Sequence, residues 1–157
     1  MSDNRKMVKF EIITEIDAPP LVCFDLSRDL DFHLDSFGHT HETIVGGVRS
    51  GLIEWNESVT WRAKHFGFYH RHTSKITAFD SPHHFRDEMT QGRFSKFAHD
   101  HYFEPTATGT RMRDVVEFQA PMGILGRMVE ALVLKNYMHQ LIAARSESLR
   151  IRAETGA

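Results

Sequence analysis

The feature that most constrains the fold is the stretch 52–121, in which apolar and polar side chains alternate over most of its length. Alternation with a period of two is typical of β-strands that bury one face. Turn-forming residues divide the stretch at Phe66-Gly67, Asp80-Ser81-Pro82, Gly92 and the segment 104–110. The pattern therefore predicts a run of strands joined by short turns, which is the layout of an antiparallel sheet.

A long helix is predicted directly after these strands, over residues 122–152. No proline occurs after Pro121, and Gly126 is the one glycine between Gly123 and Gly156. A helix of this span is about 45 Å long. The second half has one apolar stripe at helical spacing, with Ser146 on the opposite, polar side. The stripe comprises Met138, Leu141, Ile142 and Leu149. The first half is apolar on more than one side, so it needs cover from the sheet and from a second helix, a bound apolar molecule or a partner subunit.

The chain before residue 52 predicts the remaining elements. Residues 8–17 alternate as a strand that ends at Ala18-Pro19-Pro20. Two short helical segments, 21–26 and 29–37, follow, and 39–45 reads as a weaker strand before a glycine-rich turn. One strand, two short helices, six strands and a long helix form an α+β arrangement. We expect a curved antiparallel sheet of about seven strands wrapped around the C-terminal helix.

Composition limits the function classes. A chain of 157 residues that is 41% apolar is long enough for one domain, which we place at 7–153. A formal net charge of −2 gives no basic field for nucleic acid. The single cysteine excludes an internal disulfide, and the N-terminus carries no apolar signal segment, so we expect a cytoplasmic protein. The apolar first half of the long helix is too short and too charged to span a membrane. No glycine-rich phosphate loop occurs, and we expect no cofactor.

The strand register predicts which polar side chains meet inside the sheet. If a three-residue loop surrounds Gly92, Asp87 lies opposite His99 and Phe85 lies opposite His101. An odd-numbered loop keeps the inward faces of two strands together, and the same argument for the next pair of strands places Asp114 opposite His99 or His101. Because buried charges are tolerated when they are paired and hydrogen-bonded, we predict that the two histidines and two aspartates interact.

Several motifs in order along the chain make it resemble the START-like (SRPBCC) superfamily, within its polyketide cyclase/dehydrase-like branch. They are Asp17-Ala18-Pro19, Cys23-Phe24-Asp25, Glu57-x-Val59-Thr60-Trp61, Phe85-x-Asp87-x-Met89-x-x-Gly92-x-Phe94, His99-x-His101-x-Phe103, Gly109-Thr110-x-Met112-x-Asp114 and Pro121-x-Gly123. The resemblance implies the helix-grip fold and a cavity between the sheet and the long helix that holds a small apolar or amphipathic molecule. It does not imply a reaction, because the superfamily includes lipid carriers as well as cyclases.

We predict that the cavity is lined by inward-facing residues of the strands and the long helix. They are Trp61, His72, Phe85, Asp87, Met89, His99, His101, Phe103, Met112, Asp114 and Met128. One hypothesis is a binder or carrier of a small apolar molecule without chemistry. The other is a cyclase or dehydratase in which His99 or His101 moves protons while an aspartate holds its tautomer. A homodimer through the apolar half of the helix is a weaker alternative.

Metal binding by histidine pairs is a further alternative. Three H-x-H pairs each place two imidazoles on one face of a strand. They are His39 with His41, His70 with His72, and His99 with His101. A zinc site needs three or four converging ligands, and nothing in this spacing requires them to converge. We therefore expect no metal.

Overall fold

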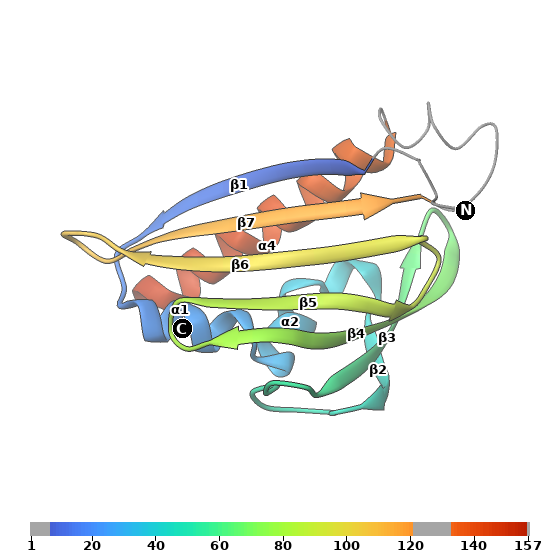
Figure 1. Ribbon diagram of the computed structural model, residues 1–157, viewed down its shortest axis with the longest axis horizontal. Coiled ribbons are helices and arrows are strands. Elements are labelled where there is room, and N and C mark those ends of the chain that lie inside the picture. Colours follow the sequence, from blue (N-terminus) through green and yellow to red (C-terminus); the bar gives the residue numbers. More distant parts are fainter. Residues whose placement is uncertain (1–6, 121–132, 157) are drawn as a thin grey trace.

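The computed structural model describes residues 7–120 and 133–156, and there an antiparallel sheet of seven strands wraps across one long helix (Figure 1). The strands are β1 (Val8–Ile16), β2 (Thr43–Gly47), β3 (Ser58–His65), β4 (Phe68–Asp80), β5 (His84–Gln91), β6 (Lys96–Pro105) and β7 (Thr110–Gln119), in the sheet order β1-β7-β6-β5-β4-β3-β2. The helices are α1 (Pro20–Ser27), α2 (Leu30–Ser36), the short 3-10 helix η1 (Gly38–Thr40) and α4 (Lys135–Thr155). The α+β, helix-grip architecture predicted from the sequence is confirmed.

Local sequence explains why the chain leaves β1 as two short helices. Pro20 occupies the first position of α1, where its missing amide hydrogen has no helical partner in any case. The carboxylate of Asp29 caps α2 by accepting hydrogen bonds from the amides of Asp31 and Phe32, at 2.9 and 3.2 Å. Because α4 packs against β1, α1 and α2, the helices lie together on one face of the sheet (Figure 1).

The strand predicted at 39–45 begins later than expected. Residues 38–40 form η1 instead, where the amide and hydroxyl of Thr40 donate to the carbonyl of Phe37, at 2.9 and 2.8 Å. His41 then adopts a left-handed conformation with φ of 50°. The strand continues through Gly46 and Gly47, which the sequence analysis assigns to a turn. Side-chain hydrogen bonding to the backbone therefore overrides the weak alternation at this point.

The predicted hairpin between β3 and β4 is confirmed. Trp61 lies opposite His72 in the register. Both loop residues have positive φ, 52° at Phe66 and 81° at Gly67, which is the turn whose twist matches that of the flanking strands. The alternation that begins at residue 52 predicts an inward position for Trp55 as well. That prediction is wrong, because β3 begins only after Trp55 and its side chain is 63% exposed.

The apolar stripe of the long helix holds in the part that the structure describes, since Ile142 and Leu149 are buried. Ser146 is predicted on the polar side of the helix, but it is buried, as is its neighbour Arg145. The helix also runs to Thr155, beyond the predicted end at residue 152. The predictions for residues 121–132, including the apolar front half of the helix and Met128, lie outside the described residues.

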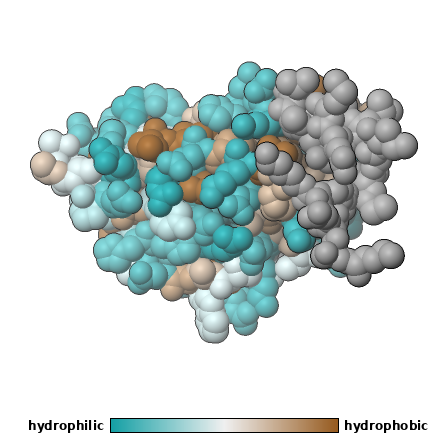
Figure 2. All heavy atoms as spheres, turned by 45° about the horizontal axis from the view of Figure 1, so that its top comes forward, coloured by the Kyte–Doolittle hydropathy of each residue, from teal (hydrophilic) through white to brown (hydrophobic). Residues whose placement is uncertain are grey.

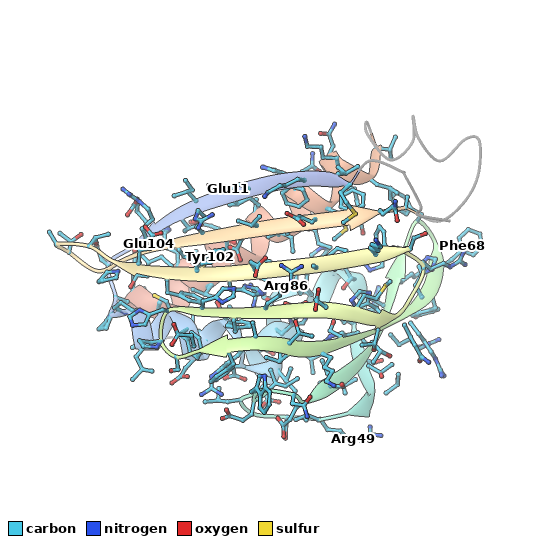
Figure 3. All side chains as sticks on the ribbon, in the orientation of Figure 1. Glu11, Arg49, Phe68, Arg86, Tyr102 and Glu104 are labelled. Carbon is cyan, nitrogen blue, oxygen red and sulfur yellow. The ribbon has the colours of Figure 1, made fainter. Side chains whose placement is uncertain are left out.

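The other face of the sheet, toward the viewer in Figure 3, carries polar and aromatic side chains. Asp100 accepts hydrogen bonds there from His84 and Arg86, at 2.7 and 2.6 Å. The Arg113 guanidinium lies 4.2 Å from the centre of the Tyr102 ring. The space-filling view shows mainly hydrophilic residues, with apolar ones in small groups (Figure 2). None of the described helices is both long enough and apolar enough to cross a membrane.

Candidate functional site

A cavity of about 330 Å³ lies between the sheet and the helices. Its volume falls within the range of small-molecule sites in proteins. The apolar part of its wall includes Ile53, Val59, Trp61, Ala63, Phe85 and Leu141. Histidines are the most frequent polar residues of the wall: His33, His65, His70, His72, His99 and His101. The cavity therefore combines an apolar surface with a set of hydrogen-bonding groups.

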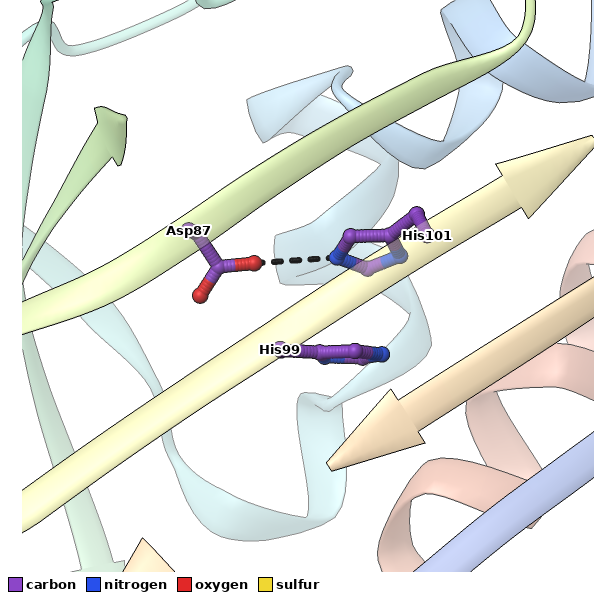
Figure 4. A group of neighbouring side chains, drawn as sticks. All are labelled: Asp87, His99 and His101. Atoms are coloured by element: carbon purple, nitrogen blue, oxygen red, sulfur yellow. Dashed lines mark hydrogen bonds and ion pairs between the residues drawn. The ribbon is translucent and has the colours of Figure 1, made fainter. Parts of the chain in front are cut away.

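Two histidines from β6 form the centre of a buried polar network in the cavity wall. Nε2 of His101 donates to Asp87 Oδ2 at 2.9 Å (Figure 4), and Nε2 of His99 donates to Asp114 Oδ1 at 2.8 Å. The predicted register is confirmed, with Asp87 opposite His99 and Phe85 opposite His101. The hydrogen bonds, however, join diagonal neighbours instead of the residues directly opposite. The prediction that these two histidines and two aspartates interact is confirmed.

Asp114 holds the network together from behind the histidines. Its side chain is fully buried and accepts a second hydrogen bond from the hydroxyl of Ser146, at 3.0 Å. Nδ1 of His101 also lies 3.0 Å from Asp114 Oδ1, but that nitrogen lacks hydrogen-bond geometry, so the contact is electrostatic. The two imidazole rings stack with their centres 3.7 Å apart. Asp114 thus connects β6, β7 and α4 at one point.

The surroundings give the two histidines different proton affinities. Burial lowers the pKa of His99, and the neighbouring His101 lowers it further. Burial also disfavours the charged form of His101, but its contacts with Asp114 and Asp87 outweigh this effect and raise its pKa. For Asp87, burial opposes ionisation, yet the hydrogen bond from His101 prevails and lowers the pKa to about 2. The network therefore joins one imidazole that binds a proton more tightly than an ordinary histidine, His101, to one that binds it less tightly, His99.

The structure separates the predicted site residues into two groups. The residues that line the cavity are Trp61, His72, Phe85, Asp87, His99 and His101. Four others do not line it. Phe103 and Met112 are buried in the core cluster that also contains Phe24, Asp114 lies behind the histidines, and Met89 packs against a second apolar cluster. Alternation predicts which face of the sheet a residue occupies, but a ligand cavity covers only part of that face.

Sequence reasoning missed several groups in the cavity wall. His33 of α2 stacks on Trp61 at 4.1 Å between ring centres, and Tyr137 of α4 lies 2.6 Å from His65 Nδ1. Arg145 of α4 also lines the cavity. The sequence does indicate the place of Arg145. It lies three residues after Ile142, so it is a polar residue on the apolar stripe of the helix.

One group among the described residues has three potential metal ligands close together: Asp87, His99 and His101, with ligand atoms within 4.8 Å of one another. Nε2 of each histidine is already hydrogen-bonded to a carboxylate. Each ring keeps Nδ1 as a potential ligand atom, as in metal sites where a histidine donates its other N–H to a carboxylate. Nδ1 of His101, however, lies 3.0 Å from Asp114 Oδ1, and a zinc site needs three or four converging ligands. The pairs His39-x-His41 and His70-x-His72 belong to no such group in the part of the chain that the structure describes.

The curved sheet, the long C-terminal helix and the cavity between them define a START-like protein of the helix-grip class. The chain belongs to the family described as polyketide cyclase / dehydrase and lipid transport, whose model matches residues 7–154. This finding confirms the resemblance stated from the sequence. No curated protein matches the chain.

Solved structures with the same fold come from bacteria and plants. The crystal structure of TTHA0849 from Thermus thermophilus is 21% identical, with a TM-score of 0.69 over 92% of this chain and 97% of that chain. SA2116 from Staphylococcus aureus, described as a protein of unknown function, is 12% identical, with a TM-score of 0.73 over 98% and 97%. Ginseng major latex-like protein 151 from Panax ginseng is 11% identical, with a TM-score of 0.67 over 94% and 97%. At these identities the likeness concerns the fold alone.

Proposed function

We propose that this protein binds a small hydrophobic or aromatic molecule in the cavity between the sheet and α4. The observation that carries the proposal is the cavity itself, about 330 Å³ in volume, with an apolar wall and a few buried polar groups. A cavity of this kind gains affinity from apolar contact and orientation from its hydrogen-bonding groups. The family description, which includes lipid transport, supports the same function.

Trp61 allows a direct test, because it lines the cavity and the only other tryptophan, Trp55, can be replaced by phenylalanine. We expect the neutral fluorescent probe N-phenyl-1-naphthylamine to quench Trp61 emission in the Trp55→Phe protein. Adding Ala63→Phe fills part of the cavity, so probe affinity falls by about 10-fold or more while thermal stability is retained. Unchanged affinity in this second variant would place the probe elsewhere and contradict the proposal.

A second candidate function is acid/base catalysis of the cyclase or dehydratase type. It is favoured by the different proton affinities of the two stacked histidines. The lowered pKa of His99 favours its unprotonated form, which can act as a base, and the raised pKa of His101 favours its protonated form, which can act as an acid. Asp114 fixes the tautomer of His99 through the hydrogen bond at Nε2.

The His99→Gln variant separates catalysis from binding. Poly-β-carbonyl compounds are the test substrates, with ring closure or loss of water followed by absorbance. If the protein is an enzyme, we expect the variant to lose about 10²- to 10⁴-fold in turnover while probe affinity stays close to that of the wild type. His84→Gln is the matched control, because His84 forms a histidine–aspartate pair on the outer face of the sheet. Equal turnover in the wild type and in His99→Gln excludes this role.

A further inference from the structure

Arg145 is a buried cation on the apolar stripe of α4. It is 3% exposed and lines the cavity. Nη2 donates to the carbonyl oxygen of Ser27 at 2.6 Å, which fixes the guanidinium against the end of α1. Its Nε and Nη1 atoms are buried and have no hydrogen-bond acceptor among the described residues. The side chain is thus held in place with part of its hydrogen-bonding capacity unused.

The carboxylates around the cavity do not complete this hydrogen bonding. Asp87 and Asp114 are bonded to the two histidines, and Glu42 lies 3.4 Å from His33. Burial lowers the pKa of Arg145, although the same three carboxylates partly counteract it. A buried donor without an acceptor is costly, and a buried charge even more so. Such a cost is typical of a group that is satisfied by a bound molecule.

We propose that the ligand is an organic acid with an apolar or aromatic body, and that its carboxylate accepts hydrogen bonds from Arg145. This inference rests on the proposed binding function and names the class of molecule bound. An acid supplies a negative charge and two acceptor oxygens, which a guanidinium can bind through two parallel hydrogen bonds. An alcohol supplies the acceptor without the charge. The rest of the molecule lies against the apolar wall near Trp61 and Phe85.

Two matched pairs of compounds test the inference: decanoic acid with decan-1-ol, and 2-naphthylacetic acid with 2-(2-naphthyl)ethanol. Calorimetry at neutral pH measures the affinity of each. In at least one pair we expect the acid to bind the wild type about 10- to 100-fold more tightly than its alcohol, and Arg145→Met to abolish that difference. Arg145→Lys restores part of the preference because it keeps the charge. Arg150→Met, on the exposed side of the same helix, leaves the preference unchanged.

The outcomes separate this inference from the proposed function. If acids and alcohols bind the wild type equally well, the Arg145 inference fails while the cavity still binds apolar molecules. If none of the four compounds binds, both proposals fail. A purely structural role would show differently: Arg145→Met would lower the unfolding temperature of the ligand-free protein and weaken acid and alcohol equally. We expect instead no loss of unfolding temperature, since a methionine removes the buried charge at similar length.

Discussion

The Asp114→Asn variant is expected to lower the free energy of unfolding by about 3 kcal/mol or more, because it removes one partner of a buried ionic network. Asp114 is fully buried and contacts His99, His101 and Ser146, which come from β6 and α4. The asparagine amide has the same shape but neither the charge nor two equivalent acceptor oxygens. Urea unfolding at neutral pH measures the loss.

The effect of Asp114→Asn depends on pH in a defined direction. Burial opposes ionisation of Asp114, but the contacts with His101 and His99 prevail and lower its pKa below the ordinary value of 3.8. A carboxyl whose pKa is lower in the folded state adds stability that is complete above pH 3.8 and declines as pH falls below it. Ionisation of Asp114 therefore makes a constant contribution above pH 3.8 to the difference in unfolding free energy between the wild type and the variant. This contribution shrinks as pH falls below 3.8.

A surface ion pair provides the control for this experiment. Glu15 accepts a hydrogen bond from Arg111 at 2.6 Å, but both side chains are more than half exposed. The Glu15→Gln variant is expected to change the free energy of unfolding by less than about 1 kcal/mol. If Asp114→Asn is no more destabilising than Glu15→Gln, the buried network contributes no more than a solvated pair, and our account of the site is wrong.

The Phe24→Ala variant is expected to cost about 3–5 kcal/mol of stability, the range for removing a buried phenyl ring. Phe24 has no exposed surface, and its ring lies 5.3, 5.4 and 5.5 Å from those of Phe79, Phe85 and Phe103, edge to face in each case. It therefore anchors α1 to β4, β5 and β6. Phe85 also lines the cavity, so the variant is expected to weaken probe binding as well as stability.

Leu21 is the matched control for Phe24, because it lies on the same helix but is 53% exposed. Leu21→Ala is expected to change the free energy of unfolding by about 0.5 kcal/mol or less. Thermal and urea unfolding of both variants measure the difference. Similar losses in the two variants would mean that α1 contributes through helix formation alone and that the aromatic cluster does not anchor it.

The sequence by itself determined the strand pattern and the composition of the buried network. A period of two fixes which side chains share a face, and turn residues fix the register, so Asp87 and His99 are opposite each other as predicted. The loop around Gly92 is longer than the three residues expected, because strand pairing ends at Glu88 and Ala98. It still contains an odd number of residues, so the same side chains face inward. Side-chain periodicity survives such local differences because each residue along a strand still points to the opposite face from its neighbour.

The sequence failed where side chains compete with periodicity. Thr40 bonds to the backbone and delays β2. Trp55 precedes β3 and is exposed in spite of its size. Ser146 and Arg145 look polar and therefore exposed, but α4 turns them toward buried partners, Asp114 and the carbonyl of Ser27. These positions depend on contacts between segments far apart in the chain, which local patterns do not contain.

The tertiary structure alone decided which of the buried residues line the cavity. It showed that Trp61 and Phe85 line the cavity while Phe103 and Met112 do not, although all four belong to one buried cluster on the same face of the sheet. It also placed Arg145 in the cavity wall with unused hydrogen-bond donors. Within the strands, periodicity in the sequence predicts which residues face the helices. Whether a buried residue meets another side chain or an open space depends on how the curved sheet and the helices pack, and only the three-dimensional structure contains that information.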